Sequence, residues 1–291
     1  MAETEEAPNA TTRTGETEKS FFKVVVHSFF VIPFLIAVFG ALLFAGIYLL
    51  TREQSSVYDY LEDVKTGGAT KRWQGAFELS RILANPGLIP NEERFVQELI
   101  HAFEQSQHDD PRTRQYIALA MGRSGKLEFV RPITNSLSNE SETTLPALIY
   151  ALGMLGQKES AESLYPFTQH QNGRIRSIAV AALGTIANPD SRGILIELLN
   201  DPEPNVQWGA AVSLAKMHDA SGKSVLMRML DREYWLQFSE VDGDEQNNLF
   251  LTAIQAAGAL GDQDLIGKIS DIARTDPSMK MRASALAVFH K

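Results

Sequence analysis

The sequence predicts an all-α protein, an α-solenoid of about six helical hairpins plus a closing helix, preceded by one transmembrane helix. Three observations lead to this fold class: a sequence repeat near 31 residues, a helix–turn–helix pattern inside each copy, and an uncharged apolar run near the N-terminus. Two short helices cannot bury two apolar stripes by themselves, so neighbouring copies must stack on one another.

The first 50 residues fall into a tail and a membrane segment. Residues 1–20 are polar and rich in Ala, Thr and Glu, without apolar periodicity, which predicts a disordered tail. Residues 24–50 are predicted to form the transmembrane helix, because residues 29–50 carry no charge and about 20 apolar residues span a bilayer. A cleaved signal peptide fits less well, since the run is long and no A-x-A-like site follows it.

Small residues recur on one face of this segment. Ala37, Ala41 and Ala45 lie four residues apart with Gly40 beside them, a spacing that lets a second helix approach closely. The face is therefore a predicted packing surface for a partner or for a second copy. The alternative is that it only reflects the composition of membrane helices.

The charges that flank the segment bear on its orientation in a cell or inner membrane. Lys19 and Lys23 precede it and only Arg52 follows closely, which favours a cytoplasmic N-terminus and an extracytoplasmic solenoid. A wider window adds basic residues on both sides and removes this bias. Residues 51–68 are expected to form a juxtamembrane helix and a linker, and residues 69–291 the solenoid.

Residues 174–199 show the repeat most clearly. The apolar stripe of the first helix consists of Ile175, Ile178, Ala179, Ala182, Leu183 and Ile186. Asn188-Pro189-Asp190 then ends that helix, and we expect Asp190 to cap the second one. We take Gly184 as the repeat mark of this unit.

The repeat mark recurs along the chain at spacings of 31, 31, 31 and 43 residues. The marks of the other units are Gly122, Gly153, Ala215 and Gly258, with weaker outer copies at Ser80 and His290. A period near 31 with two helices in each unit is typical of an α-solenoid and not of a single globular core.

Several units share a turn and an arginine before the first helix. Asp110-Pro111 and Arg114 precede IALAMG, Arg176 precedes AVAALG, and Asp276-Pro277 and Arg282 precede ASALAV. Over residues 70–291 the chain resembles HEAT-like repeats, specifically the short bacterial form in the family of phycobilisome-lyase HEAT-like repeats. The resemblance implies a solenoid fold and a binding scaffold.

The recurring charged residues are expected to be structural. The arginines that start the units should pair with acids or carbonyl groups of the neighbouring unit, the alternative being a ligand-binding ladder. These arginines are Arg72, Arg114, Arg176 and Arg282. Aspartates before proline have the position of helix caps, and they are Asp110, Asp201 and Asp276.

The link at residues 231–245 is about 12 residues longer than the other links between units. It carries four apolar residues, Tyr234, Trp235, Leu236 and Phe238, which a solvated loop would not need. Aromatic residues are common at interface hot spots, so these four are candidate protein-binding residues. The alternative is that the insert packs on its own repeats.

No pattern for catalysis, a cofactor or a metal is found. The six histidines are scattered, and no zinc-protease motif, P-loop, dinucleotide fingerprint or nucleophile elbow occurs. The Asp-Gly-Asp-Glu run at 242–245 lacks the spacing of a calcium loop. We therefore expect neither an enzyme nor a small-molecule substrate. With no cysteine, disulfides and thiolate metal sites are excluded.

The charge balance indicates what kind of partner to expect. Residues 55–291 carry 30 acidic and 23 basic residues, a net charge of −7. Such a solenoid is expected to lack the basic stripe that nucleic acid requires. We therefore expect protein partners associated with a membrane, bound by a single-pass anchored scaffold that serves as an accessory subunit of a membrane complex.

Two other functions stay open from the sequence. The family resemblance implies a bilin-lyase-like or tetrapyrrole-binding protein as one alternative. The small-residue face of the membrane segment suggests a homo-oligomeric structural membrane protein as the other.

Overall fold

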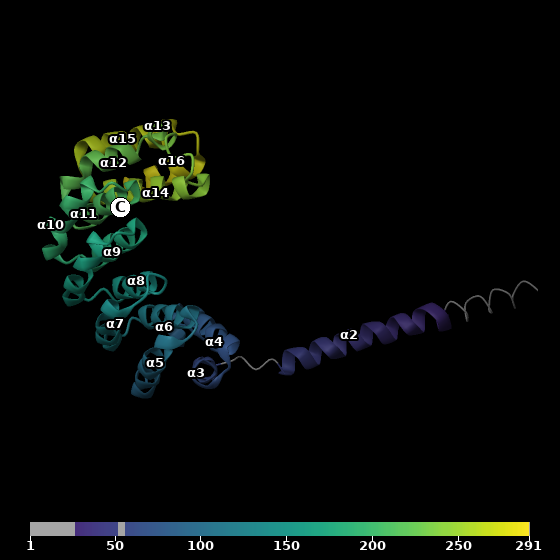
Figure 1. Cartoon of the computed structure of the whole chain (residues 1–291). Coiled ribbons are helices and arrows are strands. Elements are labelled where there is room, and N and C mark those ends of the chain that lie inside the picture. The colour runs from purple at the N-terminus through teal and green to yellow at the C-terminus, as the bar shows by residue number, and fades with distance from the viewer. Residues whose placement is uncertain (1–26, 52–55, 291) are drawn as a thin grey trace, which may run out of the picture. The chain divides into compact units, whose positions relative to one another are not determined.

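The computed structural model describes residues 27–51 and 56–290, and every regular element in these residues is helical (Figure 1). The chain divides into two units, residues 1–55 and 56–291. The predicted tail at residues 1–20 lies outside the described residues.

The described part of the first unit is one continuous helical segment. A π-helical turn, η1 (His27–Val31), continues into α2 (Ile32–Thr51). The stretch Phe29–Ile47 has a mean hydropathy of 2.6 over 19 residues, and none of it is buried against other parts of the protein. By length and composition this stretch is able to cross a membrane.

The second unit is an array of stacked helices that begins with α3 (Val57–Thr66). Ser56 and Asp59 form a reciprocal capping box at its start, and Val57, Leu61 and Val64 are buried against α4 and α5. Residues 57–66 of the segment predicted as a juxtamembrane helix and linker thus form a helix, α3. This helix packs on α4 and α5, so the second unit begins at Ser56.

Each repeat contributes a first helix to the array. These are α4 (Ala69–Ile82), α6 (Pro111–Ser124), α8 (Leu145–Leu155), α9 (Gly173–Ile186), α11 (Pro204–Lys216), α14 (Gly243–Leu260) and the closing α16 (Met279–Val288). Consecutive first helices pack on one another along the whole array. The all-α solenoid that the repeat predicts is the observed architecture.

The repeat marks lie where consecutive first helices come closest. A Cβ atom added at Gly122, Gly153 or Gly184 would lie 2.8–3.0 Å from the Cα of the residue opposite it. The residue opposite Gly184 is Ser213, two positions before the next mark. Since a backbone atom cannot give way, only glycine permits this separation. The small residue at the repeat mark is thus a packing requirement.

The second element is shorter than the first in every repeat except the third, and it is often 3₁₀-helical. These elements are α5 (Glu93–Gln105), α7 (Val130–Ser136) with η4 (Leu127–Phe129) and η5 (Leu137–Asn139), η6 (Lys158–Gln169), α10 (Arg192–Glu197) with η7 (Pro189–Ser191) and η8 (Leu198–Asn200), α12 (Lys223–Met229) after η9 (Ala220–Gly222), and α15 (Gln263–Thr275). Short 3₁₀ turns also lie at η2 (Pro86–Leu88) and η3 (Ser106–His108).

Prolines shape two of these second elements. Pro166 lies inside η6, where it supplies no N–H for an α-helical hydrogen bond. The cap after α9 is Asn188, whose side chain accepts from the N–H of Asp190, so the expected cap at Asp190 is wrong by two residues. Asn188 takes this role because its side chain can fold over the proline turn.

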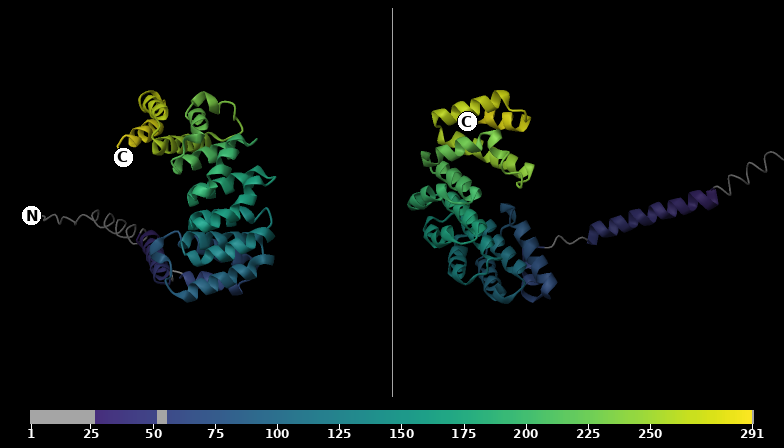
Figure 2. Two further views of the ribbon diagram at one scale, coloured as in Figure 1. Left: turned by 90° about the vertical axis from the view of Figure 1, so that its left-hand side faces the viewer. Right: turned by 45° about the horizontal axis from the view of Figure 1, so that its top comes forward.

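The array curves towards its first helices. Second elements contact their successors much less than first helices do, so the first-helix side is the shorter one. In Figure 1 α7 and α10 lie on the outer side of the curve, and α8 and α14 on the inner side. Figure 2 shows the same stacked array from two other directions. The first helices therefore form the inner, concave surface.

The core of the array is divided into two apolar clusters that meet at α11. One extends from Val57 to Leu214 and the other from Trp208 to Ala285. At the end of the array Val288 packs against Gly258, whereas Phe289 is 47% exposed.

Candidate functional site

The inner surface carries a row of residues that are not buried. They lie three positions before each repeat mark, which places them on the concave face of every first helix. The row consists of Phe77, Leu119, Tyr150, Ala181, Val212 and Gln255. We call it the inner row. Phe77 is 39% exposed and Tyr150 is 53% exposed.

An aromatic contact stiffens one end of the inner row. The rings of Phe77 in α4 and Tyr116 in α6 meet edge to face with their centroids 5.2 Å apart. This is a favourable arrangement of aromatic rings. Tyr150, on α8, has no aromatic partner among the described residues and is free to contact another molecule.

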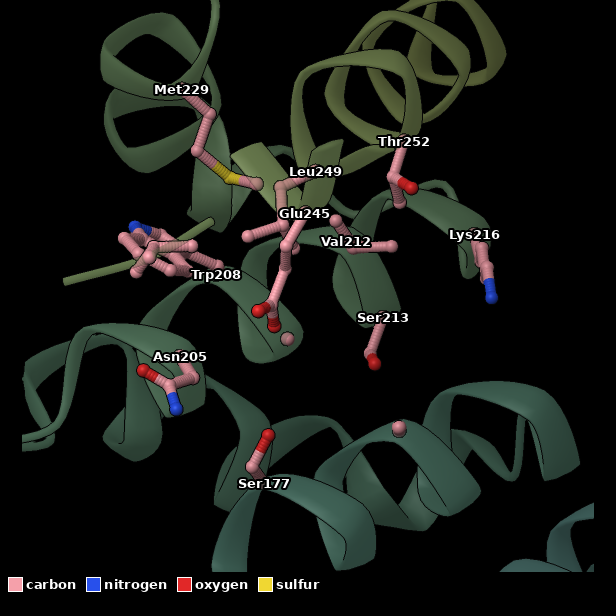
Figure 3. A pocket seen from close by; sticks show the side chains of 13 residues that line it. Ser177, Asn205, Trp208, Val212, Ser213, Lys216, Met229, Glu245, Leu249 and Thr252 are labelled. Atoms are coloured by element: carbon pink, nitrogen blue, oxygen red, sulfur yellow. The ribbon is translucent and has the colours of Figure 1, made fainter. Parts of the chain in front are cut away.

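A cavity of about 370 Å³ opens in the inner surface beside α9, α11 and α14 (Figure 3). Its lining residues are Ser177, Ala181, Asn205, Trp208, Gly209, Val212, Ser213, Lys216, Met229, Val241, Glu245, Leu249 and Thr252. Ala181 and Gly209 make room because they lack large side chains. This volume lies at the lower end of the range of ligand pockets.

The polar groups of the cavity are placed apart from each other. In Figure 3 the carboxylate of Glu245 points into the cavity near its middle, and the side chain of Lys216 lies beyond Ser213 at one side. Asn205 and Ser177 lie at the opposite side from Lys216. The cavity thus offers an apolar wall of Trp208, with a cation at one margin.

The insert at 231–245 contributes Val241 and Glu245 to the lining of this cavity. It contains the short α13 (Arg232–Trp235), and its aromatic residues surround Trp208 of α11. The Trp208 indole N–H donates to the Tyr234 hydroxyl at 3.0 Å, and the Trp235 indole N–H donates to the Met229 carbonyl at 2.9 Å. Both indoles are nearly fully buried.

The four candidate residues of the insert are therefore in different surroundings. Tyr234, Trp235 and Phe238 come together in the aromatic cluster with Trp208, packed on the protein's own repeats. Leu236 is 80% exposed and lies outside that cluster. A docking role for the insert stays a prediction, and Leu236 is the residue through which it would act.

The arginines that start the units behave as expected for structural groups. Arg176 binds Asp201 through two hydrogen bonds of 2.8 Å and donates to the carbonyl of His170. Arg114 binds Glu140 and the Phe103 carbonyl. The side chains of Arg114 and Glu140 are only 5% and 6% exposed.

The sixth unit makes the same connection with a residue from the insert. Phe250 stands eight positions before the mark Gly258, where Arg114 and Arg176 stand in their units. Arg232 of α13 lies over the Phe250 ring at 5.0 Å and binds Asp276 through two hydrogen bonds of 2.8 Å. The insert thus supplies the guanidinium that the helix lacks.

The small residues of the membrane segment all lie on α2. Ala37, Gly40, Ala41 and Ala45 are exposed. Their surface is available for a partner helix, and its use for packing stays a prediction. In the part of the chain that the structure describes, no three His, Asp or Glu side chains are grouped so as to hold a metal ion.

Sequence reasoning missed the cavity and the position of Trp208. The signal was present, because Trp208 stands seven positions before its mark, where the preceding unit has the small Ser177. When one unit has a large residue and the preceding unit a small one at the same repeat position, the inner surface is uneven between the two units. Finding it required knowing which repeat positions face inwards.

Comparison with known proteins finds one family match, over the middle of the array. A family model for HEAT repeats matches residues 161–237. The matched stretch includes most of the second element of the third unit, the fourth and fifth units and α13. It therefore covers α9 and α11, which line the cavity.

Two solved structures share the architecture over most of the chain. A chain of the CpcE–CpcF complex of phycocyanin lyase from Nostoc sp. PCC7120 has a TM-score of 0.59 and 20% identity, covering 82% of this chain and 88% of that one. The Escherichia coli protein YibA has a TM-score of 0.50 and 20% identity, covering 85% of each chain. At this identity the similarity establishes the fold. No curated protein matches the sequence.

Proposed function

We propose that this protein is a single-pass membrane-anchored scaffold whose HEAT-repeat surface binds another protein, as an accessory subunit of a membrane complex. The observation that carries the proposal is the exposed inner row, with Tyr150 and Phe77 on the concave surface. Concave solenoid surfaces commonly bind extended partners, and exposed apolar patches mark interaction sites.

The test is co-purification of the full-length tagged protein from membranes of its own cells. Asp in place of both Phe77 and Tyr150 is expected to abolish the association with the partner that the unaltered protein retains. The matched control places Asp at Leu127 and Ile196, which are 53% and 38% exposed on second elements. If the control variant loses the partner and the inner-row variant keeps it, the proposal is wrong.

Membrane anchoring is supported by the length and hydropathy of Phe29–Ile47. We infer that the anchor lies in the cell membrane, the inner one in a Gram-negative host, with the repeats on the extracytoplasmic side, as Lys19 and Lys23 favour. The chain has no cysteine, so Ser239→Cys in the insert gives a single labelling site. Reaction with a membrane-impermeant maleimide in intact cells, after outer-membrane permeabilisation where needed, supports this side. Protection until lysis contradicts it.

The similarity to a phycocyanin lyase chain supports one alternative, a protein that binds or attaches a bilin. The cavity beside Trp208 is where a planar ligand would have an aromatic wall. Titration of the purified protein with biliverdin, read by visible absorption, separates this alternative from the scaffold. A saturable spectral change that Trp208→Ala removes would favour it.

Self-association through Ala37, Ala41 and Ala45 is the other alternative. Mass measurement of the purified chain in mild detergent distinguishes it from a scaffold for a different protein. A monomer is expected from the scaffold proposal, and a stable oligomer that Ala41→Leu disrupts would favour the homo-oligomer.

A further inference from the structure

Charge is distributed unevenly between the two sides of the array. The seven first helices together carry eleven basic residues (Lys or Arg) and three acidic residues (Asp or Glu). The rest of residues 56–290 carries eleven basic and 27 acidic residues. The net negative charge of the repeat region therefore resides on the second elements and links. The first helices themselves carry a net positive charge, which the overall composition conceals.

Some of these inner cations have structural partners and others do not. Arg114 and Arg176 are bound by carboxylates, as described above, and Arg81 pairs with Glu78. Within the described residues four exposed first-helix cations have no carboxylate partner: Arg123, Arg174, Lys216 and Lys280. Of these, Arg123 donates one hydrogen bond to the carbonyl of Ser80.

The repeat register places these cations beside the inner row. Arg123 and Lys216 stand one position after their marks, and Lys216 lines the cavity. Arg174 stands ten positions before its mark, where the next unit has Asn205, another cavity residue. Positions ten before, three before and one after the mark are separated by seven and four residues, so they share one helix face. Cations thus flank the inner row on both sides.

Acidic groups on this surface are few. Glu78 is paired with Arg81 at 2.6 Å, and Glu245 is the acid that lines the cavity. Asp110 is bound by Arg112, whose guanidinium also lies over the Trp73 ring at 4.4 Å. From α6 to α11 the first helices contain no Asp or Glu. These four helices therefore carry basic but no acidic side chains of their own, and the nearest acids, Glu142 and Glu203, come from the links and lie beside the start of α9.

We propose that the inner surface binds an acidic segment of the partner protein, in extended conformation. Its apolar side chains would lie on the inner row and enter the cavity beside Trp208, and its carboxylates would pair with Arg123, Arg174 and Lys216. The proposal rests on the proposed function and specifies the chemistry of the partner. Packed helices are about 8–10 Å apart and an extended chain advances about 3.3 Å per residue, so about three residues cross each repeat.

A peptide suits this surface better than a nucleic acid. Phosphate binding gains affinity from many cations, and only four are free here. The inner row, in contrast, is an apolar strip with cations beside it. Such a surface suits a peptide that carries both apolar and acidic side chains. An RNA strand or an anionic membrane surface is kept as an outcome of the test.

The test uses the full chain in nanodiscs of uncharged lipid and a fluorescein-labelled 16-residue peptide made of four Glu-Glu-Phe-Ser repeats. Fluorescence anisotropy is expected to show saturable binding that weakens as salt rises. The variant with Arg123, Arg174 and Lys216 all changed to Glu should bind the peptide with an affinity lower by about tenfold or more. A peptide with Gln in place of Glu should also bind more weakly to the unaltered protein.

The matched control changes three unpaired cations of the second elements, Arg131, Lys158 and Lys268, to Glu. It alters the net charge equally, so equal weakening by both variants overturns the proposal. Absent or salt-independent binding of the acidic peptide also overturns it, as does preferential binding of oligouridylate or of phosphatidylglycerol vesicles. Helical circular dichroism of each variant shows that it is folded, and Tyr150→Ala tests the inner row with no change of charge.

The two proposals fail in different ways. If Asp at Phe77 and Tyr150 removes the cellular partner but the triple charge reversal keeps it, the scaffold function holds and the acidic segment is wrong. If neither variant affects the partner, the inner surface is not the binding site.

Discussion

Two regular units and the sixth unit form the same arginine–carboxylate ion pair with arginines from different elements. In the units that begin at α6 and α9, an arginine of the first helix binds a carboxylate at the end of its own unit. In the sixth unit Phe250 occupies that position, and Arg232 of the insert reaches Asp276 instead. The same ion pair is thus formed by a residue 18 positions earlier in the sequence.

This difference shows what the insert contributes to the array. Its length separates the last two marks by 43 residues instead of 31, yet the apolar cluster around Trp208 and Trp235 is buried as well as the regular core. The aromatic side chains of the insert therefore belong to the solenoid interior, whereas Leu236 is 80% exposed. Four predictions test how far the comparison holds.

The largest effect is expected inside the insert. Trp235→Ala removes a buried indole and its hydrogen bond to Met229, and should lower the free energy of unfolding by about 3–5 kcal/mol. Leu236→Ala, one residue on, should change it by less than about 0.5 kcal/mol. Urea unfolding of the solubilised chain measures both. Similar losses for the two variants would show that the insert is not packed as described.

A comparable loss is expected in a regular unit. Arg114→Ala leaves Glu140 buried without its cation, which costs about 3–5 kcal/mol. Arg232→Ala should cost less, because the Arg232 side chain is 41% exposed and water replaces part of its interaction with Asp276. The same urea titration compares them. A larger loss for Arg232→Ala would contradict the view that the regular units hold the tighter ion pairs.

A smaller effect is expected at the repeat marks. Gly184→Ala brings a methyl group within 2.9 Å of the Ser213 Cα, so the two helices must move apart, at a cost of about 1–3 kcal/mol. Gly258→Ala meets only side-chain atoms of Val288, which can rotate, and should cost under about 1 kcal/mol. Thermal melting gives the order. The reverse order would mean that the marks are not the closest contacts.

The smallest effect concerns Asp110, which caps α6. Hydrogen bonds from the Arg112 side chain and N–H lower the pKa of this carboxyl from 3.8 to about 2. A carboxyl whose pKa is lower in the folded state stabilises the fold above its unfolded pKa and loses this effect as pH falls through the folded value. The difference in melting temperature between the unaltered chain and Asp110→Asn should therefore be constant above pH 5 and shrink between pH 4 and 2. A difference independent of pH in that range would contradict the assignment.

Much of the fold follows from the sequence because repetition reveals which residues matter. Gly122, Gly153 and Gly184 recur at a fixed spacing, and the structure explains them through one contact distance. Arg114 and Arg176 were predictable as structural residues for the same reason. The membership of α3 in the array was not, because its buried face of Val57, Leu61 and Val64 equally suits an isolated amphipathic helix.

The site was less accessible to sequence reasoning, since it depends on which side of each helix faces inwards. The net charge of −7 for residues 55–291 gives no sign that Arg123, Arg174 and Lys216 share the inner face. Net charge does not reveal such a local group of cations, because it sums over both sides of a curved array. Trp208 was missed because its burial depends on Tyr234, which lies 26 residues later and comes from an irregular segment.

The central claim is that the inner row contacts the partner, and photo-crosslinking in cells tests it most directly. A photoreactive phenylalanine analogue is placed at Tyr150 in one strain and at Leu236 in another, both exposed by more than half. We predict a crosslinked adduct of a partner protein from position 150, and a further adduct from position 236 would support the docking role of the insert. An adduct from position 236 with none from position 150 would contradict the account and assign binding to the insert.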